Sequence, residues 1–370
     1  MSHAAYMAQA IQLARKGWYT TRPNPRVGCV LVHDGQVVGQ GSHLKAGEPH
    51  AEVHALREAG ELARGADAYV TLEPCSHQGR TPPCADALVE AGVKRVFVGM
   101  QDPNPLVAGR GLARLETAGI QVSSGLLEDQ ARALNPGFIK RMQTGRPWVV
   151  AKQAASLDGR TAMASGESQW ITGPEARADV QKLRAASCAI ITGVDSLLAD
   201  NSRLTVREPG FTQLYGFSQP LRVILDSQLR TPPEAEIFQQ SGSTLVITQQ
   251  ASIKNRVEQR GALQQVGAEV LAVPTAATAT GLDLSAVLLL LAERNCNQVM
   301  IEAGARLTGA FMQQQLLDEL WLYLAPKFLG SAARGLLDLP GLESLAQAPQ
   351  MQVTDVRAVG QDWRFQLVKN

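Results

Sequence analysis

Two successive runs of alternating strand-like and helix-like segments constrain the fold of this chain most strongly. They are separated by a turn-rich break, Thr144-Gly145-Arg146-Pro147, in which glycine and proline disfavour regular secondary structure. The chain has 370 residues, more than a single hydrophobic core usually supports. We therefore expect two domains of the α/β class, residues 1–145 and residues 146–370.

The first run predicts a sheet covered by helices. Its first two strands meet at Asp34-Gly35, a strong hairpin signal, and its first helix has an apolar face. The expected elements are helices over about 3–16, 50–59 and 83–91 and strands over 27–32, 37–41, 68–72 and 95–99. This order is typical of an α/β sandwich.

The second run predicts an independent α/β domain with its own sheet. The expected strands are 148–151, 221–226, 244–248, 269–273, 298–301 and 319–325, and helices are expected over 174–186 and 282–294. The longest apolar stretch, 286–292, is far shorter than a membrane span, so no membrane partner is expected. The N-terminus lacks the features of a signal peptide, and we expect a cytoplasmic protein.

Charge and composition favour a small substrate over a polymer. The net charge is +1, from 35 basic and 34 acidic residues, whereas nucleic-acid binding usually needs a basic surface. All six histidines lie between His3 and His77, so histidine-dependent chemistry must belong to the first domain. The five cysteines are better explained by a metal or catalytic role than by disulfides.

The first domain carries the residues of a zinc site. His50-Ala51-Glu52 is followed by Pro74-Cys75 and then by Cys84. Histidine and cysteine are preferred zinc ligands, and three of them leave a fourth position for a water molecule whose pKa the metal lowers. The order H-x-E, P-C and a second cysteine is the zinc deaminase signature, in which the glutamate moves protons without binding the metal. We expect one Zn²⁺ per chain, held by His50, Cys75 and Cys84, with Glu52 as catalytic acid–base.

Two features of this motif depart from the simplest pattern. Eight residues separate Cys75 from Cys84, whereas the general signature has two. Residues two apart on a helix point in nearly opposite directions, so His50 and Glu52 converge only if the metal lies off the helix end. A zincin metalloprotease needs adjacent His-Glu and does not fit, so we interpret His54 as a packed or surface residue and Cys29 as a core residue.

Two neighbouring segments extend the match beyond the zinc ligands. Residues 23–28, Pro-Asn-Pro-Arg-Val-Gly, lead into a strand, and residues 71–77, Thr-Leu-Glu-Pro-Cys-Ser-His, deliver Cys75. With them the whole chain resembles the bacterial bifunctional deaminase–reductases of riboflavin biosynthesis. The resemblance implies a cytidine-deaminase-like α/β/α sandwich followed by a dihydrofolate-reductase-like α/β domain.

The resemblance also implies two successive reactions on a small pyrimidine nucleotide. The first is zinc-dependent hydrolytic deamination of 2,5-diamino-6-(5-phosphoribosylamino)pyrimidin-4(3H)-one. The second is NADPH reduction of 5-amino-6-(5-phosphoribosylamino)uracil to its ribitylamino product. A homo-oligomer, a dimer or a tetramer, is expected.

The segment between the cysteines carries His77 and Arg80 on a glycine-containing loop. Such a loop can hold the substrate phosphate, although an exposed loop with incidental charge is the alternative. Asn24 is either a residue that binds the polar edge of the substrate or a turn residue between two prolines.

The second domain contains no G-x-G-x-x-G after its first strand, which argues against a Rossmann dinucleotide site. Instead, residues 299–309 run from a strand through Gly304 into a helix, and such a junction can bind a pyrophosphate.

Six segments of the second domain match the reductases of the same family: 152–161, 168–172, 198–201, 204–207, 224–227 and 325–327. By resemblance, the residues that contact the substrate are Ser168, Arg184, Leu204, Arg207 and Glu302. Those that contact NADPH are Ala154, Trp170, Ser196, Asp200, Ser227, Gly304, Ala305, Arg306, Leu307, Thr308, Gly309 and Ala310. The domain has no histidine, so the proton donor is Lys152, Asp200 or Glu302, with Lys152 as our first choice.

Two other functions are compatible with parts of the sequence. A nucleoside or RNA-base deaminase with an unrelated appended domain would favour a basic surface rich in aromatic residues, which the +1 charge and 5% aromatic content do not indicate. An inactive deaminase-fold scaffold would favour an incomplete zinc motif, whereas His50, Glu52, Cys75 and Cys84 are all present.

Overall fold

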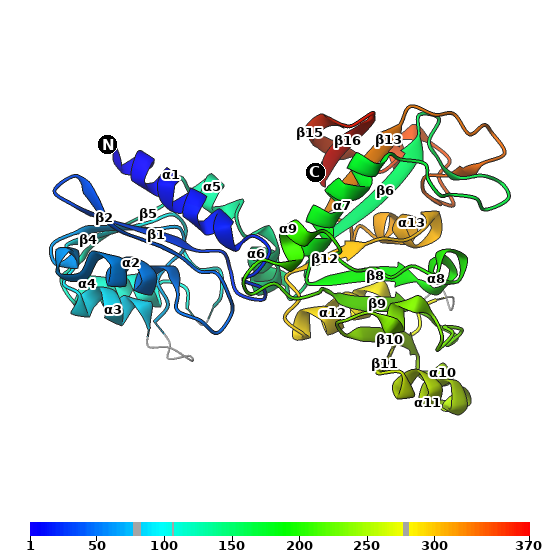
Figure 1. The fold of residues 1–370 in the computed structure, drawn as a ribbon, viewed down its shortest axis with the longest axis horizontal. Helices are drawn as coiled ribbons and strands as arrows, with labels where there is room; N and C mark the ends of the chain where they lie inside the picture. Colours follow the sequence, from blue (N-terminus) through cyan, green and yellow to red (C-terminus); the bar gives the residue numbers. More distant parts are fainter. Residues whose placement is uncertain (77–82, 106, 277–280) are drawn as a thin grey trace. The chain divides into compact units, whose positions relative to one another are not determined.

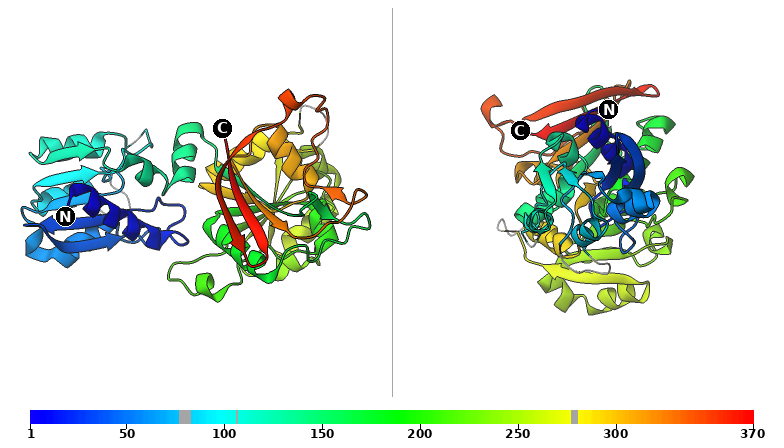
Figure 2. Two further views of the ribbon diagram at one scale, coloured as in Figure 1. Left: turned by 90° about the horizontal axis from the view of Figure 1, so that it is seen from above. Right: turned by 90° about the vertical axis from the view of Figure 1, so that its left-hand side faces the viewer.

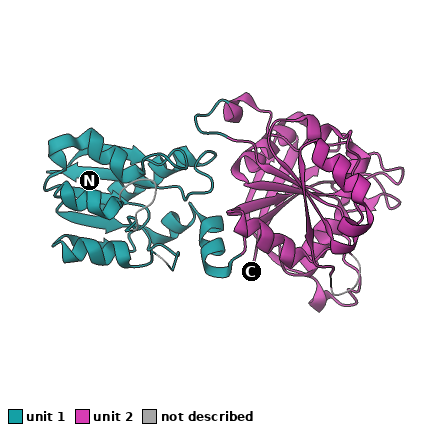
Figure 3. Cartoon of the chain, turned by 90° about the horizontal axis from the view of Figure 1, so that it is seen from below, with its two compact units in different colours: residues 1–145, 213–217 teal, residues 146–212, 218–370 magenta. Residues whose placement is uncertain are grey.

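The computed structural model describes residues 1–76, 83–105, 107–276 and 281–370. The chain forms two compact units (Figure 3). Unit 1 comprises residues 1–145 together with 213–217, and unit 2 comprises residues 146–212 and 218–370. Among the described residues, no helix has both the length and the apolar character needed to cross a membrane.

Unit 1 is a three-layered α/β/α sandwich around a sheet with strand order β2-β1-β3-β4-β5 over the described residues (Figure 1). Alternate residues of a strand face opposite sides of its sheet. Val30 and Val32 of β1 therefore pack with α1, while Cys29 and Leu31 pack with the helices of the other face. The hairpin β1–β2 and the pair β1–β3 are antiparallel, and β3, β4 and β5 are parallel.

The elements of unit 1 are α1 (His3–Ala14), β1 (Gly28–His33), β2 (Gln36–Ser42), α2 (Ala51–Ala59), β3 (Asp67–Val70), α3 (Cys84–Glu90), β4 (Arg95–Val98), α4 (Arg110–Thr117), β5 (Gln121–Ser124), α5 (Glu128–Arg132) and α6 (Pro136–Thr144), with 3₁₀ turns at Arg15–Gly17 and Gly60–Ala63. The predicted helices and strands of this half are confirmed, with ends displaced by no more than two residues.

A glycine sets how closely α2 approaches the sheet. A Cβ atom on Gly41 of β2 would lie 1.8 Å from the carbonyl oxygen of Ala51, the first residue of α2. Any larger residue would push the start of the helix away from the strand. Gly41 therefore fixes the position of the helix end that bears His50.

Unit 2 contains a larger twisted sheet, with order β11-β10-β9-β8-β12-β6-β13-β16-β15 among the described residues. The strands from β11 to β13 are parallel, and β16 and β15 add an antiparallel hairpin at one edge, drawn in red in Figure 2. Helices α12 and α13 cover one face of the sheet, and α7, α8 and α11 cover the other. Both faces are thus buried, as parallel sheets require.

The elements of unit 2 are β6 (Trp148–Ser156), β7 (Arg160–Ala162), α7 (Pro174–Ala186), β8 (Ala189–Gly193), α8 (Val194–Asp200), α9 (Pro209–Thr212), β9 (Leu221–Leu225), β10 (Thr244–Gln249), α10 (Gln250–Asn255), α11 (Val257–Gln265), β11 (Ala268–Val273), α12 (Leu284–Glu293), β12 (Gln298–Ile301), α13 (Ala305–Gln313), β13 (Glu319–Ala325), β14 (Arg334–Gly335), β15 (Met351–Val359) and β16 (Asp362–Lys369), with 3₁₀ turns at Glu236–Gln239 and Leu345–Gln347.

One predicted strand of this half was too short. The pattern indicated an end at Ala151, but β6 continues to Ser156 because it pairs with β13 along its length, up to Ser156 opposite Ala325. The extension places Lys152 and Ala154 on a strand rather than in a loop.

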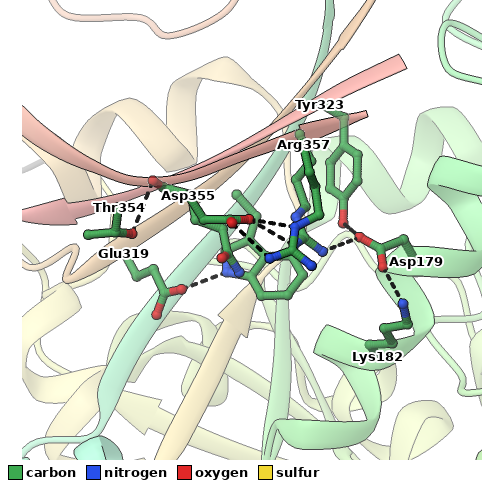
Figure 4. A network of polar contacts seen from close by, with 10 residues as sticks. Asp179, Lys182, Glu319, Tyr323, Thr354, Asp355 and Arg357 are labelled. Carbon is green, nitrogen blue, oxygen red and sulfur yellow. Dashed lines mark hydrogen bonds and ion pairs between the residues drawn. The ribbon is translucent and has the colours of Figure 1, made fainter. Parts of the chain in front are cut away.

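A buried polar network ties α7 to the C-terminal hairpin (Figure 4). Asp179 of α7 accepts hydrogen bonds from Arg364 of β16, at 2.6 Å, and from the Tyr323 hydroxyl of β13, at 2.9 Å. The side chains of Asp179 and Arg364 are 5% and 6% exposed, so neither charge is solvated by bulk water. Lys182 also contacts Asp179, at 2.7 Å, but its side chain is 55% exposed.

This difference in exposure predicts two different effects on stability. Asp179→Ala leaves Arg364 buried without its closest counter-charge and should lower the free energy of unfolding of unit 2 by about 3–5 kcal/mol. Lys182→Ala removes a solvated partner of the same carboxylate and should cost about 1 kcal/mol or less. Urea denaturation followed by tryptophan fluorescence measures both, since Trp148, Trp170, Trp321 and Trp363 all belong to unit 2. Equal effects of the two variants would contradict the role given to burial.

Candidate active sites

The predicted metal ligands of unit 1 converge. The ligand atoms of His50, Cys75 and Cys84 all lie within 4.8 Å of one another. His50 Nδ1 lies 3.3 Å from Cys84 Sγ and 3.7 Å from Cys75 Sγ. Two sulfurs and an imidazole nitrogen are a donor set that zinc prefers, and three ligands leave a coordination position open. The residues present therefore fit a catalytic zinc ion.

The ends of two helices bring these ligands together. His50 is the N-cap of α2 and has extended backbone angles, φ −75° and ψ 170°, so its side chain does not follow the helical spiral. Glu52 lies in the first turn of the same helix. Two residues of a helix at this spacing would point in nearly opposite directions, but His50 precedes the helix, so its side chain and that of Glu52 can face the same site. Cys84 is the first residue of α3, and its N–H donates to Cys75 Sγ at 3.3 Å.

Glu52 lies beside the ligands without being one of the three. Its side chain is 3% exposed, and Oε2 has no hydrogen-bond partner among the described residues. Burial raises the pKa of its carboxyl to about 7. A buried carboxyl group that exchanges a proton near neutral pH suits general acid–base catalysis.

The remaining histidine and cysteine interpretations are confirmed. His54 does not belong to the metal-ligating group, and its N–H bonds to the His50 carbonyl as part of α2. Cys29 is fully buried within β1.

A further histidine, His43, was missed by the sequence analysis. Its Nε2 lies 3.1 Å from Nδ2 of Asn24, and its ring packs edge-on against that of His50, with centroids 5.1 Å apart. Burial lowers the pKa of His43 to about 4, so the ring is neutral at pH 7. Asn24 therefore lies next to the metal ligands through His43, although no motif spacing joins these residues.

Glu73, two residues before Cys75, was also missed as a site residue. Its buried carboxylate accepts backbone N–H groups of Asp102, Gly109, Gly111 and Leu112, at 2.9–3.4 Å. This carboxylate binds the start of α4 to the segment that carries Cys75. His77 and Arg80, the predicted phosphate-binding residues, lie outside the described residues.

Unit 2 contains a cavity of about 1620 Å³ on the side of the carboxyl ends of β8, β9 and β12. It is lined by the predicted residues Lys152, Ala154, Ser168, Trp170, Arg184, Ser196, Asp200, Leu204, Arg207, Ser227, Glu302, Gly304, Ala305, Arg306 and Leu307. Thr308, Gly309 and Ala310 do not line it. A Cβ on Gly309 would lie 2.0 Å from the carbonyl oxygen of Asp338, so this part of α13 packs against the chain instead.

Two of the charged residues that line this cavity, Arg184 and Glu302, form an ion pair with each other. Arg184 of α7 grips Glu302 through two hydrogen bonds of 2.8 and 2.7 Å and donates a third to the Thr205 carbonyl at 2.8 Å. Burial alone would raise the pKa of Glu302, but Arg184, with Lys152 and Arg207, lowers it to about 2. Glu302 is therefore a carboxylate at neutral pH.

Lys152 differs from Arg184 in having no hydrogen bond or ion pair with any described residue. Burial lowers the pKa of its ammonium group, and the nearby Arg184 acts in the same direction. Glu302 and Asp200 act against this shift. An ammonium group whose pKa is lowered gives up its proton more readily.

A hydrogen bond to a serine of α8 fixes the turn that leads into α13. The N–H of Gly304, the N-cap of α13, donates to Ser196 Oγ at 3.2 Å. On the other side, Gln153 of β6 donates to the Ala303 carbonyl and to Thr308 Oγ1, at 3.0 and 2.6 Å. The first N–H groups of a helix have no partners within it and attract anions.

Comparison with known proteins adds two matching families. The cytidine and deoxycytidylate deaminase zinc-binding region matches residues 1–100, and the RibD C-terminal domain matches residues 147–365. The riboflavin biosynthesis protein RibD of Escherichia coli is 53% identical to this chain, over 100% of both sequences. Its counterpart from Haemophilus influenzae is 48% identical, over 96% of this chain and 95% of its own.

The chain belongs to the RibD family.

Two solved structures of the RibD family match the whole fold. Acinetobacter baumannii RibD has a TM-score of 0.91 and 48% identity, over 99% of this chain and 98% of that chain. A Thermotoga maritima protein, described as a diaminohydroxyphosphoribosylaminopyrimidine deaminase and 5-amino-6-(5-phosphoribosylamino)uracil reductase, has a TM-score of 0.84 and 31% identity, with the same coverage.

The fold class and function expected from the sequence are confirmed. The chain joins a cytidine-deaminase-like domain to a dihydrofolate-reductase-like RibD domain, and it is a bifunctional deaminase and reductase of riboflavin biosynthesis. It acts on pyrimidine intermediates of that pathway. Its deaminase site binds zinc through His50, Cys75 and Cys84, and the reductase of this family uses NADPH.

The zinc site gives a prediction about metal content. The purified protein should contain one zinc per chain, and the double variant Cys75→Ser, Cys84→Ser should contain almost none, since one imidazole cannot retain the ion. Cys188→Ser, which changes a free cysteine of unit 2, is the matched control and should keep the full content. Atomic absorption on dialysed protein measures all three. Stoichiometric zinc in the double variant would disprove the ligand assignment.

Proposed function

We propose that residues 1–145 deaminate 2,5-diamino-6-(5-phosphoribosylamino)pyrimidin-4(3H)-one and that residues 146–370 reduce the resulting 5-amino-6-(5-phosphoribosylamino)uracil. The observation that carries this proposal is the complete set of chemical groups in each unit. Unit 1 has three metal ligands beside the buried Glu52, and unit 2 has a cavity with a glycine turn and with Lys152, which has no ion pair among the described residues. The name of the Thermotoga relative supports this choice of substrates.

In the deaminase domain, His50, Cys75 and Cys84 hold the zinc ion. Zinc, when bound, lowers the pKa of a water molecule at its open position and so supplies a nucleophile near neutral pH. Glu52 takes the proton of the attacking water and passes it to the amino group that leaves as ammonia. Its lack of a partner at Oε2 leaves that oxygen available for this transfer.

Asn24 is placed to bind the polar edge of the pyrimidine. The neutral His43 beside it has its Nδ1 3.2 Å from the Pro49 carbonyl oxygen. If Nδ1 donates to that carbonyl, Nε2 must accept from the Asn24 amide nitrogen. Such a bond orients the amide and leaves its oxygen free to accept from the substrate.

In the reductase domain, Lys152 supplies the proton. Reduction adds a hydride at C1 of the sugar and breaks the bond from C1 to the ring oxygen, so that oxygen must gain a proton. NADPH, when bound, supplies the hydride. Glu302 is ionised and held by Arg184, so it has no proton to give at neutral pH. Asp200 is the remaining alternative, and burial raises its pKa.

The cavity divides into a substrate side and a cofactor side in this proposal. Ser168, Arg184, Leu204, Arg207 and Glu302 form the substrate side, with Arg207 on the phosphate. Ala154, Trp170, Ser196, Asp200, Ser227 and the part of the turn from Gly304 to Leu307 form the cofactor side. Within that turn, Gly304 to Leu307 line the cavity, which supports contact of the pyrophosphate with the start of α13.

We further propose that the chain is a cytoplasmic homo-oligomer. All five cysteines are free, as expected in a reducing compartment. The edge hairpin β15–β16 exposes Val353, Val356 and Trp363, each 45–49% accessible, and an exposed apolar edge supports pairing with another subunit.

A reciprocal pair of variants tests the assignment of the two activities. Glu52→Gln should reduce ammonia release about 10²–10⁴-fold, because it removes the acid–base group, while NADPH oxidation with the deaminated substrate is unchanged. Lys152→Met should reduce NADPH oxidation by a similar factor, because it removes the proton donor of the reductase, while ammonia release is unchanged. Both rates are measured on each variant in steady state.

The reciprocity makes each variant the control for the other. Loss of both activities in either variant would contradict independent sites. Glu52→Gln with deamination within a few-fold of wild type would show that Glu52 does not carry the proton, and retained reduction in Lys152→Met would transfer that role to Asp200.

A further inference from the structure

Three arginines that line the reductase cavity, Arg184, Arg203 and Arg207, differ in how far their charge is already paired. Arg184 is fully engaged by Glu302 and the Thr205 carbonyl, and Arg203 forms an ion pair with Glu236 at 2.5 Å. Among the residues that the structure describes, the Arg207 guanidinium makes one weak contact, 3.5 Å to Thr205 Oγ1. Of these three arginines, Arg207 therefore has charge left for an anion.

The electrostatics at Arg207 agree with this geometry. Burial lowers the pKa of its guanidinium, and the neighbouring cations Arg184 and Arg203 lower it further. A cation repelled by its neighbours gains more from a bound anion than a cation that is already paired. An anion at this point would bring the local charge back toward balance.

Gln181 of α7 contacts the backbone of Arg207. Its side chain lines the cavity and is 7% exposed, and Oε1 accepts the backbone N–H of Arg207 at 2.9 Å. A backbone N–H can only donate, so the atom that faces it must be the amide oxygen. The amide nitrogen of Gln181 is thereby turned away from Arg207 N–H, and it has no hydrogen-bond partner among the described residues.

The backbone that carries Arg207 is held in place before any ligand binds. Gln219 makes two hydrogen bonds with Val206: its Oε1 accepts the Val206 N–H at 2.9 Å, and its Nε2 donates to the Val206 carbonyl at 2.8 Å. Arg184 holds the Thr205 carbonyl, and Leu204 has a positive φ of 49°, a conformation that costs energy for a leucine. Such a fixed segment presents Arg207 in a defined position.

We propose that Gln181 is a second ligand of the substrate phosphate, whose amide nitrogen donates to a phosphate oxygen while its amide oxygen holds Arg207 beside it. The two residues form an anion clamp in which one side chain supplies charge and the other supplies a neutral, oriented donor. Because Gln181 adds no charge, it does not compete with Glu302 for Arg207 or Arg184. This inference rests on the proposed substrate side of the cavity.

Two substitutions at Gln181 separate phosphate binding from simple support of Arg207. Glutamate in Gln181→Glu still accepts the Arg207 N–H but cannot donate, and its charge repels phosphate. Leucine in Gln181→Leu removes both functions without adding charge. The matched control is Gln219→Leu, which removes support from the same segment at a residue that does not line the cavity.

Each variant is assayed in the NADPH-dependent reduction with two substrates, 5-amino-6-(5-phosphoribosylamino)uracil and the same compound without its phosphate. Inorganic phosphate is added as a competitive inhibitor in a parallel series. Binding of NADPH, followed by its fluorescence, reports whether the cavity remains folded.

The clamp predicts that Gln181→Glu raises KM for the phosphorylated substrate about 10- to 100-fold, the effect of losing a hydrogen bond to a charged group, and more than Gln181→Leu does. The inhibition constant of inorganic phosphate should rise in parallel. With the dephosphorylated compound, Gln181→Glu should change KM less than about two-fold. A substitution affects the binding of a ligand group mainly where the two are in contact, and this compound lacks the phosphate that Gln181 contacts. NADPH affinity should be unchanged.

Three results would overturn the inference, and they are distinguishable. Wild-type KM in Gln181→Glu, with losses in Gln181→Leu and Gln219→Leu, would mean that Gln181 only supports the Arg207 backbone. Equal losses on both substrates would mean that it acts on the sugar or on the fold. Arg207→Gln without any effect on the phosphorylated substrate would instead show that the proposed substrate side itself is wrong.

Discussion

Both sites depend on charged or ionisable side chains that are buried at the ends of helices and strands. A buried charge is tolerated only when a partner or an oriented backbone group balances it. In unit 1, His50 and Cys84 sit at the starts of α2 and α3, where two thiols and an imidazole meet beside Glu52. In unit 2, Glu302 follows β12 and is balanced by Arg184 from α7.

This balance decides which groups remain reactive. Arg184 pairs with Glu302 and keeps it ionised, so that among the described residues Lys152 has no ion pair in the same cavity and the Arg207 guanidinium has one weak contact. In the deaminase site, the sulfurs and His50 engage one another, while one oxygen of Glu52 has no described partner. In each unit most of the buried polar groups are paired with one another. The groups that have no strong partner among the described residues, Glu52 in unit 1 and Lys152 and Arg207 in unit 2, are available for catalysis or binding.

The zinc site could be predicted from sequence because its signals are local. His50 and Glu52 are two residues apart, Cys75 follows a buried strand, and Cys84 follows two prolines, so short motifs carry the information. The metal chemistry and the helix ends could be derived from these residues alone. The convergence of His50 with Glu52 could not, because it depends on His50 being an N-cap rather than a helical residue.

Residues whose partners lie far along the chain escaped prediction for the same reason. Glu73 binds backbone groups of residues 102–112, His43 meets Asn24 across a hairpin, and the end of β6 is set by β13. Gln181 resembles any polar helical residue until the fold brings Arg207 to it. The roles given to the reductase residues came from family resemblance, and the structure adds the reason that Arg184 and Arg207 differ.

The central claim is that one chain carries two chemically independent sites, of which one depends on zinc. The most direct measurement is to remove zinc from the intact protein with a chelator and to follow ammonia release and NADPH oxidation in the same sample. Ammonia release should be lost and should return on addition of Zn²⁺, while reduction of the deaminated substrate continues at its original rate. Loss of reduction together with deamination, in protein that remains folded by circular dichroism, would contradict this claim.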